Sequence, residues 1–141
     1  RIEIGPKRTA WAKKNNPTAE CNEMDCRVIG TLLPGFDAII CGFCMPYLSK
    51  EDCAKLIKDC AGLLNRAGIF YFSTIENEYE HSGYETSSDG QHSMYIHYYP
   101  EQYLREVLKE NDLDVVYMKR KNYKKANGTP TTDIIFIAKK K

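Results

Sequence analysis

Two carboxylates stand at the ends of short segments whose composition favours strands. Glu3 lies within Ile2-Glu3-Ile4, and Asp25 follows the weakly alternating residues 19–24. Open α/β sheets bind ligands outside the carboxyl ends of their strands, where a carboxylate can accept hydrogen bonds from a ribose diol or an adenine amino group. Ordinary solvated strand-end carboxylates show the same spacing, so this pattern alone supports a nucleoside site and a plain surface equally.

A third candidate segment follows the apolar residues 36–41. Cys41-Gly42-Phe43-Cys44 begins where this run ends, and Gly42 would let a ligand approach the backbone closely. The same four residues form a C-x-x-C, which is typical of redox dithiols and of half a zinc site. Redox pairs normally open a helix, and structural zinc normally takes four ligands. Because this pair ends an apolar strand without a second C-x-x-C, we expect no metal and interpret the cysteines as packing residues.

Residues 76–98 form a long polar stretch, rich in tyrosine and histidine, between a predicted strand and a predicted helix. Long connections in compact domains are often lids or binding loops. We therefore expect substrate contacts from this stretch and from the segment after Cys44, through Met45, Tyr47, Tyr84, Tyr95 and His97. The candidates for moving a proton are His92, His97 and Tyr47, although a single histidine more often simply faces water.

Helices that must position these groups follow from periodicity and capping signals. Apolar residues recur at helical spacing in residues 50–65, after the N-cap candidate Ser49, and Gly68 has the place of a glycine beyond the helix C-terminus. Proline in a first turn predicts two more helices, over residues 6–15 and 100–111.

Apolar runs predict the strands. Residues 36–41 read as a strand buried on both faces and central in a parallel sheet, followed by a second buried strand at 69–75. Residues 115–118 and 134–138 flank a polar loop and predict an antiparallel hairpin. The order of elements indicates an α/β fold with a mostly parallel sheet, helices on both of its faces and a C-terminal antiparallel hairpin.

Composition excludes several classes of protein. The 141 residues carry 20 basic and 19 acidic side chains, so a net charge of +1 gives no field that would attract nucleic acid. A basic run at residues 119–125 is typical of a solvated rim. The longest apolar stretches fall far short of the about 20 residues that span a membrane, and no signal peptide opens the chain. We expect one soluble, cytoplasmic domain over residues 1–141.

The order of these segments resembles that of class I S-adenosylmethionine-dependent methyltransferases, which have a Rossmann-like sheet. Ile2-Glu3-Ile4-Gly5-Pro6-Lys7 and Met24-Asp25-Cys26-Arg27 are similar to the family's second and third strands, and residues 36–49 to its fourth strand and loop. Residues 63–70 resemble the turn into the fifth strand, and residues 99–139 the closing helix and hairpin.

This resemblance implies S-adenosylmethionine as cofactor, with a role for each matching position. Glu3 would bind the ribose, Asp25 with Cys26 would border the adenine, and Cys41, Gly42 and Phe43 would line the methionine side. Residues 76–98 would be a substrate-side insertion. Methyl transfer is an in-line displacement, so positioning carries much of the catalysis and a dedicated base is not required.

One family feature is missing from the sequence. No G-x-G-x-G occurs among the 141 residues, although in the family this loop follows the first, central strand and wraps the methionine end of the cofactor. We expect the domain to be partial, starting at the second strand, with the first strand and its loop before residue 1. A different segment, a second chain or a rearranged sheet are the alternatives.

Three functions remain open at this point. The first is methyl transfer to a small-molecule acceptor, with a homo-oligomer as a possible assembly and neither nucleic acid nor membrane as partner. The second is a non-catalytic binding or interaction module that has lost the cofactor loop. The third is a nucleotide-sugar or NAD-dependent Rossmann enzyme, which the antiparallel final hairpin disfavours.

Overall fold

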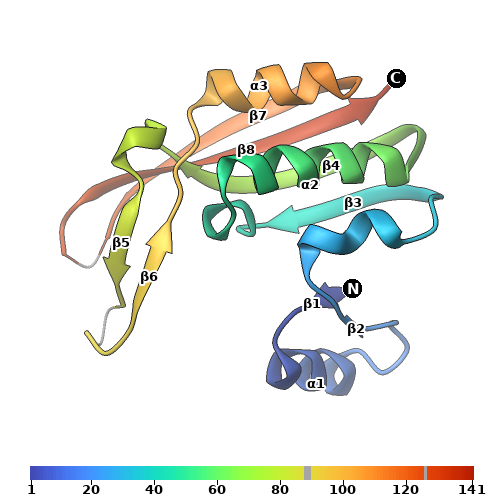
Figure 1. Ribbon diagram of the computed structural model, residues 1–141, viewed down its shortest axis with the longest axis horizontal. Coiled ribbons are helices and arrows are strands. Elements are labelled where there is room, and N and C mark those ends of the chain that lie inside the picture. Colours follow the sequence, from blue (N-terminus) through green and yellow to red (C-terminus); the bar gives the residue numbers. More distant parts are fainter. Residues whose placement is uncertain (88–89, 126) are drawn as a thin grey trace.

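The computed structural model describes residues 1–87, 90–125 and 127–141. Its centre is a four-stranded sheet in the order β3-β4-β8-β7 (Figure 1). Long strands build most of it, and their bounds are Phe36–Gly42 for β3, Leu64–Glu76 for β4, Leu113–Lys124 for β7 and Pro130–Lys140 for β8. All four overlap predicted strands and extend beyond them, most of all β7 and β8, and the predicted C-terminal hairpin is confirmed as β7–β8.

The expectation of a mostly parallel sheet is wrong. Within this sheet the one parallel pairing among the described residues is that of β3 with β4, with Ile39 opposite Phe70, whereas β8 pairs antiparallel with both β4 and β7. The reason is the hairpin: β8 returns directly from β7 and inserts between β7 and β4, so it reverses two of the three pairings. A parallel pair needs a crossover, and α2 supplies the crossover between β3 and β4.

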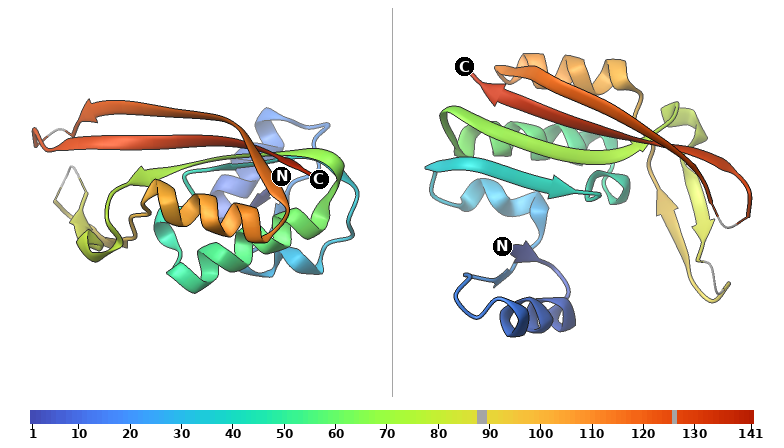
Figure 2. Two further views of the ribbon diagram at one scale, coloured as in Figure 1. Left: turned by 90° about the horizontal axis from the view of Figure 1, so that it is seen from above. Right: turned by 180° about the vertical axis from the view of Figure 1, so that it is seen from behind.

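The expectation that β3 is central and covered on both faces is also wrong. β3 is an edge strand, and Ile40 is 78% exposed. The helices α2 (Lys50–Leu63) and α3 (Glu101–Glu110) lie on the same face of the sheet, as both views of Figure 2 show. Among the described residues nothing covers the opposite face, so helices on both faces are not observed.

The hydrophobic core lies between this sheet and the two helices. Phe70, Phe72 and Phe136 are fully buried, with ring centroids 5.1 Å apart in each neighbouring pair. Burying aromatic rings of this size dominates the energetics of a small core. Alternate residues of β4 and β8 supply it, which is the period expected of strands with one covered face.

Helix α2 begins as predicted and ends earlier. The Ser49 hydroxyl accepts a hydrogen bond from the Asp52 backbone, and the helix stops at Leu63 instead of residue 65. The left-handed residue after it is Ala67, with φ 62°, and not the predicted Gly68. Glycine is needed at 68 for a different reason, since a Cβ there would lie 2.8 Å from the Asn65 carbonyl oxygen.

Residues 1–25, which we call the N-terminal unit, lie beyond the free edge of β3 (Figure 1). Two short strands pair parallel, with Glu3 opposite Glu23, and a helix connects them; their bounds are Ile2–Glu3 for β1, Pro6–Asn15 for α1 and Asn22–Glu23 for β2. They form a separate two-stranded sheet. The helical turn η1 (Cys26–Thr31) follows and packs on α2, joining the unit to the rest.

The predicted long loop at residues 76–98 contains ordered structure. After the turn η3 (Tyr79–His81), the strands β5 (Gly83–Thr86) and β6 (Ser93–Ile96) form an antiparallel hairpin, which we call the aromatic hairpin. It projects from the end of the sheet toward which β3 points (Figure 1). No helix within the described residues is long and apolar enough to cross a membrane.

Candidate functional site

Glu3 is placed at the carboxyl end of β1, where α1 begins. Its Oε1 atom accepts a hydrogen bond from the Gly5 backbone N–H at 3.1 Å and lies 3.9 Å from the Arg8 guanidinium. The side chain is 17% exposed. No described residue donates a hydrogen bond to Oε2. One carboxylate oxygen is therefore fixed by the helix start, and the other is available to a ligand hydroxyl.

Asp25 follows β2, and its backbone position next to Glu3 comes from the strand pairing. The Met24 backbone N–H donates to the Glu3 carbonyl at 3.2 Å, which brings the ends of β1 and β2 together. The Asp25 carboxylate caps η1 by accepting from the Arg27 backbone N–H at 2.9 Å, and its second oxygen lies 2.9 Å from the Arg27 guanidinium. Arg27 therefore holds both oxygens of this carboxylate.

Gly42 and Phe43 end β3 in an unusual backbone geometry. Phe43 has φ 49°, a left-handed conformation that is rare and costly for a bulky residue. Its N–H donates to the Ser73 carbonyl at 3.1 Å and lies 3.2 Å from the Ser73 hydroxyl, which stabilise the turn. A Cβ at Gly42 would meet no atom within 4 Å, so the backbone here borders open space. Strained backbone beside open space is typical of ligand sites.

Two sets of predicted cofactor residues thus come from separate sheets. Glu3, Asp25 and Cys26 come from the N-terminal unit and the start of η1, whereas Cys41, Gly42 and Phe43 come from the edge of the main sheet. A thiol pair joins them, because the Sγ atoms of Cys26 and Cys44 lie 3.3 Å apart. The carboxyl ends of β1, β2 and β3 therefore meet along one border of the molecule.

Hydrogen bonding and burial disfavour the thiolate forms of the two thiols at this junction, since they raise both pKa values. A hydrogen bond with Cys44, together with burial, raises the pKa of Cys26 well above its usual range. The pKa of Cys44 rises to about 12, because a hydrogen bond with Cys41 and burial outweigh the lowering effect of Cys26. All six cysteines are free, and no described group of three or more His, Cys, Asp or Glu residues could hold a metal ion.

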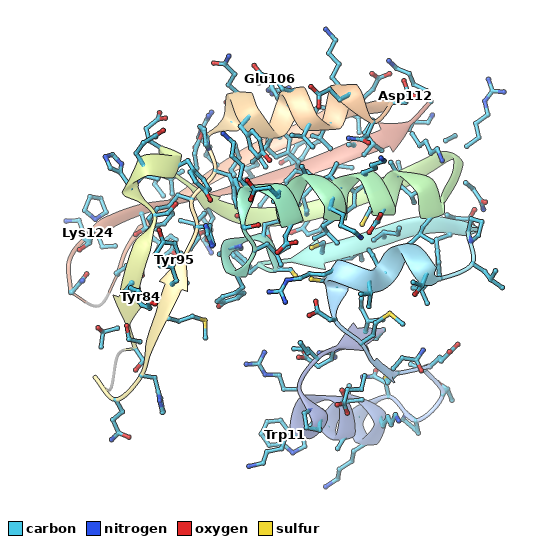
Figure 3. The ribbon with its side chains drawn as sticks, in the orientation of Figure 1. Trp11, Tyr84, Tyr95, Glu106, Asp112 and Lys124 are labelled. Carbon is cyan, nitrogen blue, oxygen red and sulfur yellow. The ribbon has the colours of Figure 1, made fainter. Side chains whose placement is uncertain are left out.

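The aromatic hairpin brings together the predicted substrate residues Tyr84, Tyr95 and His97. The rings of Tyr84 and Tyr95 (Figure 3) meet edge to face with centroids 5.3 Å apart, and the Tyr95 centroid lies 4.8 Å from that of the His97 ring. The Nδ1 atom of His97 is 3.2 Å from the Tyr79 hydroxyl, and the His97 N–H donates to the Pro46 carbonyl at 2.8 Å. These contacts dock the base of the hairpin onto the segment that follows β3.

The remaining predicted substrate and proton-transfer residues, Tyr47, Met45 and His92, lie in three different places. Tyr47 is 53% exposed and belongs to the turn η2 (Met45–Tyr47), whose Pro46 carbonyl accepts the hydrogen bond from the His97 backbone N–H. Met45 is fully buried in the core and offers no surface to a ligand. His92 precedes β6 and His97 follows it, so the length of the strand separates them by roughly 17 Å. They cannot act on one proton together.

The sequence analysis did not identify the hollow between the aromatic hairpin and the tip of β7–β8. One cavity of about 580 Å³ lies at the end of β4, and a second of about 860 Å³ adjoins it. Both are lined by Tyr98, Lys125 and Thr129. Tyr98 lies far from Lys125 and Thr129 in the sequence, and no local pattern links it to these two residues.

Charges in this hollow are paired. Lys125 and the Tyr98 hydroxyl both donate hydrogen bonds to the Glu85 carboxylate. Burial alone would raise the pKa of Glu85, but these hydrogen bonds outweigh burial and hold the pKa below its usual value. Glu76 at the end of β4 receives two hydrogen bonds of 2.6 Å from Arg120. A ligand in this hollow would meet aromatic rings and satisfied ion pairs, which suits a neutral polar molecule.

Comparison with solved structures identifies the fold. A methyltransferase from Methanosarcina mazei, described as S-adenosylmethionine-dependent, matches 99% of this chain and 80% of its own, with a TM-score of 0.82 and 14% identity. Magnesium protoporphyrin IX methyltransferase from Synechocystis, solved with bound S-adenosylmethionine, matches 99% of this chain at a TM-score of 0.71 and 14% identity. This chain covers 58% of that enzyme.

A third neighbour is the N-methyltransferase NodS from Bradyrhizobium japonicum, solved with S-adenosylhomocysteine. It has a TM-score of 0.66 and 14% identity, over 99% of this chain and 64% of its own. No protein-family model and no curated protein matches the sequence. The chain therefore has the α/β fold of S-adenosylmethionine-dependent class I methyltransferases, as its motif order indicated.

Proposed function

We propose that this chain binds S-adenosylmethionine and takes part in methyl transfer to a small-molecule acceptor. The observation that carries the proposal is the border formed by the ends of β1, β2 and β3. There, a carboxylate with one oxygen that no described residue binds, an aspartate that caps η1 and a strained glycine-phenylalanine turn follow strand ends, where open α/β sheets bind ligands. The solved neighbours that hold the cofactor or its product support the proposal.

The residues present fit the adenosine half of the cofactor. Glu3 would accept hydrogen bonds from the ribose hydroxyls through Oε2, since Oε1 is occupied by Gly5. Asp25, oriented by Arg27, and Cys26 would border the adenine. Cys41, Gly42 and Phe43 would line the methionine side, where the open space at Gly42 leaves room. When bound, the cofactor supplies an electrophilic methyl group on a sulfonium.

The acceptor would bind against the aromatic hairpin. Tyr47, Tyr84, Tyr95 and His97 lie at the same end of the sheet as Phe43, and the paired charges of the adjoining hollow favour an uncharged polar molecule. His97 would hold a proton released by the acceptor on Nε2, because Nδ1 faces the Tyr79 hydroxyl. In-line displacement depends mainly on holding the two reactants close, so this proton transfer is secondary.

Titration calorimetry with S-adenosylhomocysteine tests the proposal. We expect saturable binding to the chain, and we expect Glu3→Gln to weaken it by about tenfold, the effect of losing about 1.4 kcal/mol from charged hydrogen bonds to the ribose. The matched control is Glu23→Gln, which changes an exposed carboxylate opposite Glu3 in the strand register. Equal affinity of both variants would remove Glu3 from the site, and no binding by the folded protein would overturn the proposal.

A non-catalytic binding module is the second candidate. Two observations favour it: the sequence contains no G-x-G-x-G, and β1–β2 shares no hydrogen-bonded pairing with β3. The same titration separates the two functions. If the protein is folded by circular dichroism and unfolds cooperatively in urea, but gives no binding heat with S-adenosylmethionine or S-adenosylhomocysteine, it has the second function.

A further inference from the structure

Cys26 and Cys44 approach each other across the junction of the N-terminal unit and the main sheet. Their Sγ atoms are 3.3 Å apart, although the residues are 18 positions apart in sequence. Both side chains are half-buried, so small oxidants can reach them. This pair is different from the C-x-x-C that the sequence analysis considered, since it links two separate structural elements.

The local backbone allows these sulfurs to come closer. A disulfide needs a separation of about 2.05 Å, so the two side chains must close roughly 1.3 Å between them. Cys26 is the first residue of η1 and Cys44 precedes η2, and neither lies in a strand. Short helical turns of this kind adjust more easily than a strand whose backbone is fixed in a sheet.

Cys41 is the competing partner for Cys44. It lies in β3, where its backbone pairs with Phe72 of β4, and its side chain packs against the core. A bond between Cys41 and Cys44 would pull the strand end out of this register, whereas a bond between Cys26 and Cys44 leaves the sheet unchanged. The geometry therefore favours Cys26.

We propose that Cys26 and Cys44 form a reversible disulfide that fastens the N-terminal unit to the carboxyl end of β3. With glutathione disulfide as oxidant, one thiolate attacks it and releases the first glutathione thiolate, forming a mixed disulfide. The second cysteine thiolate then attacks the protein sulfur of that mixed disulfide and releases the second glutathione. Two cysteine thiols are oxidised, one glutathione disulfide is reduced, and the two cysteine protons end on the two glutathione thiols.

The bond would also act on the proposed cofactor border, a consequence that rests on the proposed function. Asp25 directly precedes Cys26, and Phe43 directly precedes Cys44. Fixing these two neighbours relative to each other removes motion that a ligand would otherwise have to stop. The oxidised protein should bind S-adenosylhomocysteine several-fold more tightly than the reduced protein.

Protonation makes the exchange slow near neutral pH. The hydrogen bond with Cys26 lowers the pKa of Cys44, but Cys41 and burial outweigh it and raise this pKa to about 12. Asp25 raises both thiol pKa values, while Arg27 lowers that of Cys26. Because only the thiolate attacks, the rate should rise about tenfold for each pH unit below the pKa. A rate independent of pH between 7 and 9 would show that the attacking thiol is a different one.

Peptide mapping after oxidation tests the bond itself. The folded protein is incubated with glutathione disulfide at pH 8.5, remaining thiols are alkylated, and trypsin then yields peptides 15–27 and 28–50. A bond from Cys26 to Cys44 joins these two peptides, whereas a bond from Cys41 to Cys44 stays within the second. Further cleavage before Asp25 and after Phe43 separates Cys26 from Cys21 and Cys44 from Cys41. We expect the joined peptides, and dithiothreitol should release them.

Variants and a binding measurement complete the test. Cys26→Ser and Cys44→Ser should abolish the joined peptides, and Cys41→Ser should retain them. An internal bond in peptide 28–50, or glutathione adducts alone, would overturn the proposal. The bond is detected without any cofactor, so a protein that forms it but never binds S-adenosylhomocysteine would refute the proposed function and leave this disulfide standing.

Discussion

The N-terminal unit and the four-stranded sheet differ sharply in how they are held. In the sheet, Phe70, Phe72 and Phe136 are fully buried beneath α2 and α3. In the N-terminal unit, α1 buries only Thr9 and Ala12, and Trp11 is 66% exposed and points away from the body of the protein (Figure 3). The sheet has a core of its own, whereas the unit is attached mainly through η1.

This contrast indicates that global stability and ligand binding depend on different regions of the molecule. The strongest packing lies under the sheet, while both carboxylates of the proposed cofactor border come from the weakly packed unit. Regions with few buried apolar contacts open at low free-energy cost, and binding elements are commonly drawn from them. We therefore expect substitutions in the sheet to change global stability and substitutions in the unit to change ligand binding.

The largest expected effect comes from truncating the core. Phe72→Ala should lower the free energy of unfolding by about 3–5 kcal/mol, because it leaves a cavity between Phe70 and Phe136. Trp11→Ala should change it by less than about 0.5 kcal/mol, because most of that side chain is exposed. Urea denaturation measures both. Similar losses for the two variants would mean that the N-terminal unit belongs to the main core.

A buried carboxylate in the sheet should make stability depend on pH. Asp133 of β8 is 9% exposed, and its Oδ1 atom has no hydrogen-bond partner among the described residues. Burial raises the pKa of Asp133, and a hydrogen bond from Tyr123 opposes this only in part. Since the folded-state pKa lies above the unfolded value of 3.8, ionisation favours unfolding as pH rises through that window.

Asp133→Asn should therefore be more stable than the wild type at pH 7, by on the order of 1 kcal/mol. The difference should shrink as pH falls toward the folded-state pKa of Asp133, because the wild-type carboxyl then takes up a proton. Urea denaturation at pH 4 and pH 7 checks the sign. Glu23→Gln, at an exposed carboxylate of the N-terminal unit, is the control and should show no comparable change. A variant less stable than the wild type at pH 7 would contradict this account.

The smallest expected effect concerns two residues with a strained backbone, of which only one belongs to the proposed cofactor site. Phe43 and Ala67 both have left-handed backbones, with φ 49° and 62°. Glycine relieves about 1–2 kcal/mol of strain at such positions and returns part of it as unfolded-state entropy, so each glycine variant should gain about 0.5–1 kcal/mol. Only Phe43→Gly should also weaken binding of S-adenosylhomocysteine. Unchanged binding would show that Phe43 does not line the cofactor site.

Local patterns in the sequence determined the helices and most of the strands. The helix over residues 6–15, the Ser49 cap and the apolar stripe of α2 are confirmed, because proline, capping and periodicity act within a few residues. The two strands of the aromatic hairpin were not predicted. Tyrosine and histidine occur on both the buried and the exposed face of a strand, so these segments show no clear alternation of apolar and polar residues.

Local sequence patterns did not predict which strands run antiparallel or which face of the sheet is covered by helices. Residues 36–41 are apolar throughout, and the sequence analysis took this as burial on both faces, yet Ile40 lies exposed in a cross-strand row with Tyr71, Ile137 and Tyr117. An apolar side chain shows that burial is favourable, but it does not show which segment provides the cover. Insertion of β8 beside β4 likewise depends on the whole topology.

The order of strands with acidic or glycine ends, and with it the resemblance to class I methyltransferases, was readable from the sequence alone. Tertiary structure alone decided the pairing of Cys26 with Cys44 and the gathering of Tyr98, Glu85 and Lys125. The physical reason is range: capping and periodicity involve neighbours along the chain, whereas these contacts join residues 13 to 40 positions apart that only the packed fold brings together.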